Sequence, residues 1–278
     1  LTFNGGIGVL ESYTERVARQ SQFEFGRARM WGSLGWAVAT FFAGLLFNIN
    51  PQLNFLVASC SGLVFFILLA RLRVSSAPHA MQEAVSGGKV TLEDALRLLT
   101  LPRFWALVFF VIGTCIYGVY DQQFPVYFSS QFATLQEGNE MYGYLNSFQV
   151  FLEAAGMFCA PWLVNRIGAK NALLTAGMIM SVRILGSSFA SSAVEVVILK
   201  MLHMFEIPFL LVGTFKYISS AFNPRLSATL FLIGFNLSKQ LSGVVLSAWV
   251  GRMYDTVGFH QAYLILGCIT LSFTLLSF

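Results

Sequence analysis

The chain has 278 residues, of which 56% are hydrophobic and only 11% charged, and its mean hydropathy is +0.69. A soluble domain of this length would need far more polar surface, so the composition excludes one. The net charge of +4 comes from basic residues in short loops between apolar segments, which excludes a nucleic-acid-binding surface. Long apolar segments also exclude a membrane β-barrel, whose strands have about ten residues of alternating polarity. We expect an all-α, polytopic membrane protein.

Apolar segments of about 20 residues, long enough to cross a bilayer, follow one another along the chain. The first ten residues are typical of the end of a span and the last ones lie inside another, so we expect a fragment of a longer protein. Complete spans are predicted over residues 28–47, 53–71, 104–128, 138–163, 171–190, 193–215, 225–248 and 260–278. The polar segment 71–103 separates the first two from the other six and predicts a linker between two membrane bundles.

Lysine and arginine gather in the loops on one side of these spans. The loops on the other side carry no basic residue at 48–54 and 133–140, and Arg252 alone elsewhere. Because basic loops stay in the cytoplasm, the first side is predicted to be cytoplasmic.

Several charged residues lie inside the predicted spans, where each costs at least about 2.5–3.5 kcal/mol and is expected to face the bundle interior. Lys200, His203 and Glu206 recur every third residue and share one helix face, and Arg183 lies on the preceding span. The acidic set is Glu11, Asp121, Glu153 and Glu206, and the basic set is Arg29, Arg183, Lys200 and Lys239. This balance, with His203 free to titrate, indicates a water-filled path for substrate and protons. The alternative is a structural charge network that only fixes helix register.

Trp36 lies two helical turns after Arg29. An aromatic ring beside an arginine and carboxylates suits a sugar, which offers an apolar C–H face and hydroxyl groups. An ordinary aromatic residue at the membrane interface is the equal alternative. Motifs for dinucleotide, ATP or zinc-protease chemistry and the GxSxG nucleophile are absent, so neither an enzyme nor ATP-driven transport is expected. The four cysteines lie in apolar segments without CxxC spacing and predict neither a disulfide nor a zinc site.

Six stretches resemble the oligosaccharide:proton symporters of the major facilitator superfamily, the lactose, raffinose and sucrose permeases. They are FEFGRARMWGSLGWA (23–37), YDQQF (120–124), NRIGAKNALL (165–174), SVRILGSSFA (181–190), VVILKMLHMFEIPFLLVGTFKY (196–217) and SATLFLIGF (227–235). That family has twelve helices in two six-helix halves, and the resemblance implies a fragment from the end of helix four to helix twelve. It implies the end of the N-terminal bundle at 1–72, a central cytoplasmic loop at 73–103 and the C-terminal bundle at 104–278.

The resemblance also implies roles for single residues. It assigns substrate binding to Glu11, Arg29, Ser33, Trp36, Tyr117, Glu153 and His203. It assigns proton coupling to Arg183, His203 and Glu206, with Glu206 as the carrier, and structural charge pairing to Asp121, Lys200 and Lys239. No catalytic residue, metal or cofactor is implied.

Three positions depart from the lactose type. The cavity glutamate of helix eight falls at Val150, and an acid stands one turn further on at Glu153, as in the sucrose type. Ser33 replaces a cysteine beside the sugar. Gly118 replaces the aspartate that pairs with the helix-eleven lysine, so we expect Asp121 to serve both Lys200 and Lys239, or Lys239 to be neutral.

The function that the resemblance implies is proton-coupled symport of a di- or trisaccharide by alternating access in the bacterial inner membrane. We expect a galactoside such as raffinose, melibiose or lactose, with sucrose-specific symport or an uncoupled facilitator or sensor as alternatives. Protons and membrane lipid are the other expected partners, nucleic acid is not, and a functional monomer is expected.

Overall fold

The computed structural model describes residues 2–71, 96–223 and 226–277, and the regular elements in these ranges are all helical. The elements are α1 (Thr2–Gln20), α2 (Phe25–Ile49), α3 (Pro51–Arg71), α6 (Pro102–Thr114), α7 (Tyr117–Ser129), α8 (Leu135–Ile167), α9 (Ala169–Phe189), α10 (Ala193–Met201), α11 (His203–Ala221), α12 (Ser227–Leu230), the π-helix η2 (Phe231–Leu237) and α13 (Ser238–Leu276). The all-α prediction is therefore confirmed.

Six helical stretches of the described chain are long and apolar enough to cross a membrane. They cover 52–71, 102–129, 135–167, 169–189, 193–221 and 227–276, and so include seven of the eight predicted spans. The last stretch holds two spans because α13 folds back at Gly258, whose φ of 81° lies in the left-handed region that glycine tolerates. The eighth predicted span, 28–47, lies within α2. The division into 1–72, 73–103 and 104–278 stays a prediction, and residues 72–95 of the expected loop lie outside the described ranges.

The helix ends follow ordinary capping chemistry. Thr134 and Ser192 precede α8 and α10, and each side chain accepts a hydrogen bond from the backbone N–H three residues on. Pro102 occupies the first turn of α6, where a missing N–H has no cost. Gly168, with φ of 83°, ends α8 and starts α9.

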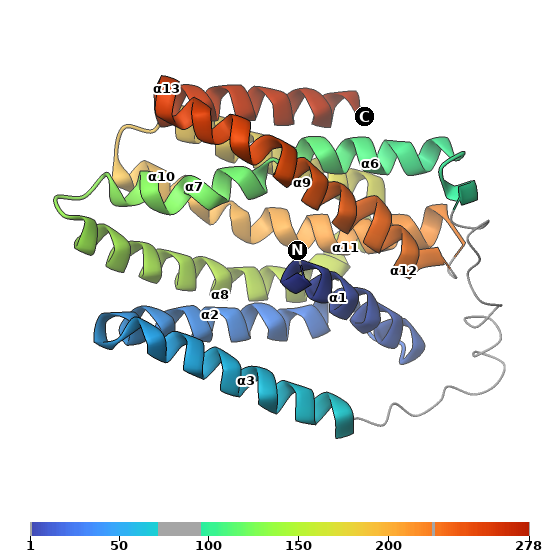
Figure 1. Cartoon of the computed structure of the whole chain (residues 1–278). Helices are drawn as coiled ribbons and strands as arrows, with labels where there is room; N and C mark the ends of the chain where they lie inside the picture. Colours follow the sequence, from blue (N-terminus) through green and yellow to red (C-terminus); the bar gives the residue numbers. More distant parts are fainter. Residues whose placement is uncertain (1, 72–95, 224–225, 278) are drawn as a thin grey trace.

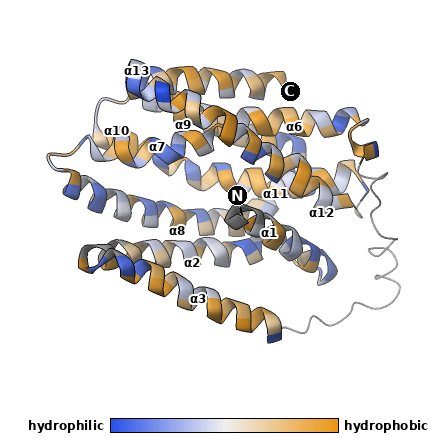
Figure 2. Cartoon of the chain, viewed as in Figure 1, coloured by the Kyte–Doolittle hydropathy of each residue, from blue (hydrophilic) through white to orange (hydrophobic). Residues whose placement is uncertain are grey.

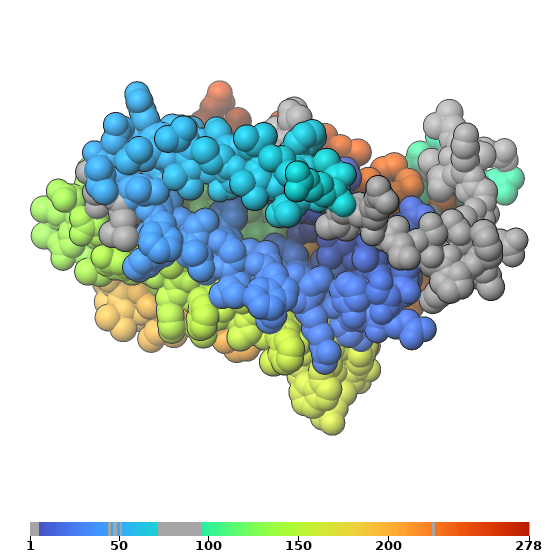
Figure 3. Space-filling view, turned by 90° about the horizontal axis from the view of Figure 1, so that it is seen from below, coloured from blue at the N-terminus to red at the C-terminus, as the bar shows by residue number. Residues whose placement is uncertain are grey.

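The helices form a bundle in which α2 packs along α8 and thereby joins the N-terminal helices to the rest (Figure 1). Figure 3 shows α3 lying across the outer face beside α2. Its large apolar side chains, among them Phe55, Leu63 and Phe66, are exposed, as expected of a span that faces lipid. Figure 2 shows hydrophobic residues along α3 and α6, and more polar ones along α2 and α8.

Regular α-helix is interrupted within three of the membrane-length helical stretches. Cys115 and Ile116 separate α6 from α7, Leu202 separates α10 from α11, and η2 interrupts the start of the α13 span. Irregular backbone at membrane depth is tolerated where it is buried in protein or lines a cavity, and π-helical turns are frequent at functional sites. The sequence predicted continuous helices here.

Candidate functional site

A cavity of about 380 Å³ lies between α1 and α2 on one side and α7, α8, α10, α11, η2 and α13 on the other. This volume is in the range of about 300–1,000 Å³ found for small-molecule sites. Ten predicted site residues line it: Glu11, Arg29, Ser33, Trp36, Tyr117, Asp121, Glu153, Lys200, His203 and Lys239. Arg183 and Glu206, each 0% exposed, lie behind the wall. The fold thus brings together side chains from both ends of the sequence.

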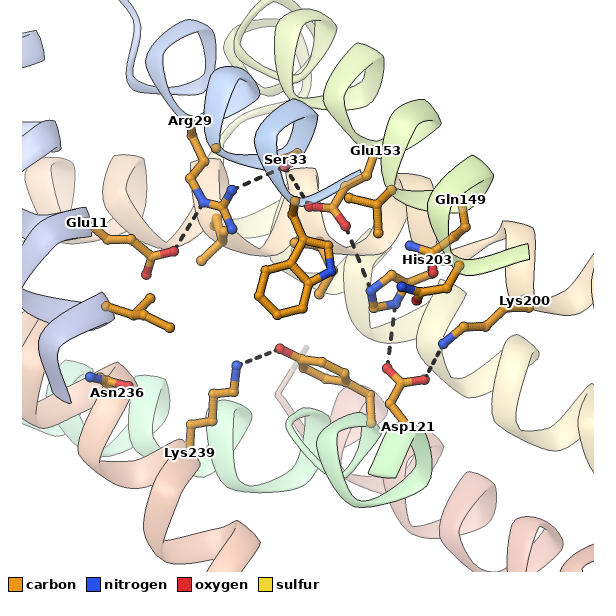
Figure 4. Close-up of a pocket in the computed structure, with 18 of the residues that line it drawn as sticks. Glu11, Arg29, Ser33, Asp121, Gln149, Glu153, Lys200, His203, Asn236 and Lys239 are labelled. Atoms are coloured by element: carbon orange, nitrogen blue, oxygen red, sulfur yellow. Dashed lines mark hydrogen bonds and ion pairs between the residues drawn. The ribbon is translucent and has the colours of Figure 1, made fainter. Parts of the chain in front are cut away.

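One group of contacts runs from α1 through α2 to α8 (Figure 4). Arg29 Nε donates to Glu11 Oε1 at 3.2 Å, and Arg29 Nη1 donates to Ser33 Oγ at 3.1 Å. Ser33 Oγ in turn donates to Glu153 Oε1 at 2.9 Å. Because Ser33 is on α2 and Glu153 on α8, this hydrogen bond crosses between two helices that are far apart in the sequence.

Trp36 lies one turn after Ser33 on the same helix, lines the cavity and is 54% exposed as a whole residue. Its ring can therefore contact a bound molecule. Arg29 and Glu153, which also line the cavity, already hydrogen-bond to the hydroxyl of Ser33 and can bind hydroxyl groups of a ligand in the same way. Val150 and Glu153 both line the cavity, as their spacing on α8 predicted.

A second group of charged side chains lies among α7, α9, α10 and α11, and its Arg183 and Glu206 are fully buried. Arg183 Nη2 donates to Glu206 Oε1 at 2.6 Å, and its Nε donates to Glu206 Oε2 at 3.0 Å. The same guanidinium reaches Asp121 Oδ1 at 2.9 Å, and Lys200 Nζ donates to that oxygen at 2.6 Å. The prediction that Glu206 faces Arg183 on the neighbouring span is confirmed. The sequence analysis predicted an Asp121–Lys200 pair separate from the Arg183–Glu206 pair. In the structure, Arg183 contacts both carboxylates and joins the two pairs in one network.

His203 connects the two groups. Its Nδ1 lies 2.5 Å from Glu206 Oε1, and its Nε2 lies 3.9 Å from Glu153 Oε2. The imidazole therefore lies between a cavity carboxylate and a fully buried one. Only the contact with Glu206 is within hydrogen-bond distance.

Lys239 differs from the prediction. Its Nζ donates to Tyr117 Oη at 2.8 Å and lies 5.1 Å from the centre of that ring. It makes no ion pair with a described residue, and the carboxylate of Asp121 is held by Lys200 and Arg183. The expectation that Asp121 pairs with both lysines is therefore wrong. The phenol of Tyr117, which lies on α7 like Asp121, accepts the hydrogen bond from Lys239 instead. A neutral Lys239 stays a prediction.

Ligand atoms of Asp121, His203 and Glu206 lie within 4.8 Å of one another, a spacing that a metal ion would also need. The oxygens concerned already accept hydrogen bonds from Arg183 and Lys200. Two fixed positive charges at the same oxygens oppose a metal cation, and the group is better described as an ion-pair network.

Sequence reasoning missed the neutral amides of the cavity. Asn146, Gln149, Asn236 and Gln240 line it together with the charged residues. These amides carry no charge, so the rule that a charged residue inside a span marks a functional site does not point to them. The available signal was the spacing of positions 146, 149 and 153, which places two amides and the acid on one face of α8.

A bundle of membrane-length helices around a polar cavity, with buried ion pairs at its wall, is the architecture of a membrane carrier for a polar solute. The whole chain, residues 1–278, matches the family model of the LacY proton/sugar symporter, and the chain belongs to this family. It therefore has the major facilitator superfamily fold and is a multi-pass protein of the bacterial inner membrane.

Similar proteins include several sugar permeases. The chain is 57% identical to a lactose permease of Klebsiella oxytoca, over 100% of this chain and 68% of that protein. It is 47% identical to a raffinose permease of Escherichia coli and 46% identical to a melibiose permease of Enterobacter cloacae, over 99% of this chain and 66% of each relative. The chain thus spans about two thirds of the length of these relatives, which are transporters.

Proposed function

We propose that this chain is the greater part of a proton-coupled symporter for a di- or trisaccharide, working by alternating access. The observation that carries the proposal is His203, which lies between Glu153 at the cavity and the buried Glu206–Arg183 pair. A substrate hydroxyl bound at Glu153 and a proton held at Glu206 would act on the same imidazole. Each would therefore change the free energy of binding the other.

In this proposal the sugar binds to Glu11, Arg29 and Glu153, with its apolar face against Trp36, when Glu206 is protonated. The N-terminal and C-terminal helices then rock around the cavity and open it to the other side. Release of sugar and proton to the cytoplasm resets the carrier. The membrane potential supplies about 2.3 kcal/mol per charge per 100 mV, in addition to the pH gradient.

An uncoupled sugar facilitator or sensor is the second candidate. A simple pore has no need for Arg183 and Glu206, each fully buried and paired with the other. Transport, not catalysis, is the proposed activity, by a functional monomer with no nucleic-acid partner. Collapse of sugar accumulation by a protonophore separates the candidates, because a facilitator equilibrates sugar and never accumulates it.

The proposed substrate is a galactoside such as raffinose, melibiose or lactose, the sugars named for three relatives. Trp36 offers an exposed ring at the cavity, and the flat C–H face of galactose suits such a ring. In cells that carry the full-length protein, we expect melibiose and raffinose to compete for uptake more strongly than sucrose.

We expect Trp36→Tyr to weaken this preference for galactosides. Trp31→Tyr is the matched control, because Trp31 lies on the same helix, is 66% exposed and is not part of the cavity wall. Should sucrose compete best, and Trp36→Tyr leave that order unchanged, sucrose-specific symport replaces the galactoside proposal.

A further inference from the structure

We propose that Asn146 and Gln149 of α8 form a subsite for the second sugar unit of the substrate, separate from the group around Arg29 and Glu153. The inference rests on the proposed function, because it assumes that the cavity takes an oligosaccharide. It assigns to two neutral amides a part in choosing between sugars of different length.

The hydrogen-bonding state of the cavity wall carries the inference. Six of the wall's charged groups already have partners within the protein: Glu11 with Arg29, Glu153 with Ser33, Asp121 with Lys200, and Lys239 with Tyr117. The side chains of Asn146 and Gln149 make no hydrogen bond to a described residue, although both line the cavity. Asn146 and Gln149 therefore have hydrogen-bonding capacity that no described residue uses.

Gln149 is the stronger case. The residue is only 1% exposed, and its Nε2 is buried without a partner. Figure 4 shows its side chain extending from α8 into the region above His203. A buried amide that lacks a hydrogen bond is destabilising, so such a group calls for a partner.

The chemistry of the amide selects the kind of partner. An amide donates from its NH₂ and accepts at its carbonyl, and it carries no charge. A sugar hydroxyl likewise both donates and accepts. An ionic ligand would gain more from the charged residues than from Asn146 and Gln149.

Position along the helix points to a second sugar unit. With a rise of about 1.5 Å per residue, Gln149 lies about 6 Å and Asn146 about 10 Å along α8 from Glu153. Both lie toward Leu135, the end of α8 that the distribution of basic residues predicts to be outside. Tyr142, one turn beyond Asn146, also lines the cavity and adds an aromatic ring. A substrate with one sugar unit at Arg29 and Glu153 would place its next unit along these residues.

The test compares sugars of increasing length in cells that carry the full-length protein with Gln149→Met or Asn146→Leu. Methionine has nearly the volume of glutamine, and no protein hydrogen bond is lost, so the amount of carrier in the membrane should stay that of the wild type. We expect KM for raffinose and melibiose to rise about 10-fold, which corresponds to about 1.4 kcal/mol. KM for methyl α-galactoside, kcat and the pH profile of uptake should stay unchanged.

Gln136→Met is the matched control, because Gln136 is exposed at the outer end of α8 and its side chain bonds only to Glu140. Equal changes for all three sugars, or no change in either variant, would overturn the subsite. A shifted pH profile with unaltered sugar preference would overturn it too, since Gln149 would then act on His203. If the wild-type protein takes up none of these sugars, the proposed function fails first, and that failure is visible without any variant.

Discussion

Replacing Glu206 by glutamine is expected to abolish accumulation of sugar against its gradient while leaving sugar exchange across the membrane intact. The Glu206 side chain is 0% exposed and accepts hydrogen bonds from two nitrogens of Arg183. Its Oε1 lies 2.5 Å from His203 Nδ1. Glutamine has the shape of the protonated acid but cannot release a proton, so the sugar-loaded carrier still reorients while the proton step is lost.

The measurement is uptake of labelled melibiose in energised cells, followed by exchange of internal label for external sugar. Glu195→Gln is the matched control, because Glu195 begins the same span, is exposed and bonds only to nearby backbone and side-chain groups of Ser191 and Ser192. Accumulation by the Glu206→Gln protein at the wild-type level would remove Glu206 from the proton path.

Asp121→Asn is expected to cause the largest loss of stability, about 3–5 kcal/mol, the usual cost of breaking a buried ion pair. Asp121 is the carboxylate that holds Lys200, which is 3% exposed, and it also binds Arg183. Neutralising Asp121 leaves the Lys200 ammonium with no ion pair to a described residue, whereas Arg183 keeps Glu206. The melting temperature of the purified full-length protein, and its abundance in membranes, should both fall.

Lys200→Met added to Asp121→Asn should restore much of this loss, because it removes the uncompensated charge while keeping an apolar stem. Asp255→Asn is the control for the same chemical change at an exposed position. If Asp121→Asn melts at the wild-type temperature, or the second substitution lowers it further, the structural role given to Asp121 is wrong.

The sequence predicted best which residues share one face of a helix. The spacing of Lys200, His203 and Glu206 follows the helical period, and all three belong to one connected network in the structure. The membrane spans were predicted equally well from the sequence. The bilayer sets their length, and a charged residue inside an apolar span is conspicuous.

The sequence could not predict in the same way which side chains of different helices contact one another. Which neighbour a buried charge meets depends on the rotation and tilt of both helices, and packing decides these, not residue spacing. Arg183 thus binds Asp121 as well as Glu206, and Lys239 meets the Tyr117 phenol. The breaks at Cys115 and Leu202 also carry no proline or glycine at the break itself to announce them.

Proton movement on sugar addition distinguishes proton-coupled symport from uncoupled sugar transport. Melibiose or raffinose is added to a lightly buffered suspension of de-energised cells that carry the full-length protein, and the external pH is recorded. We expect a rise in external pH as protons enter with the sugar, and no rise for Glu206→Gln, although that variant still equilibrates the sugar. Entry of sugar into wild-type cells without any change in external pH would contradict it.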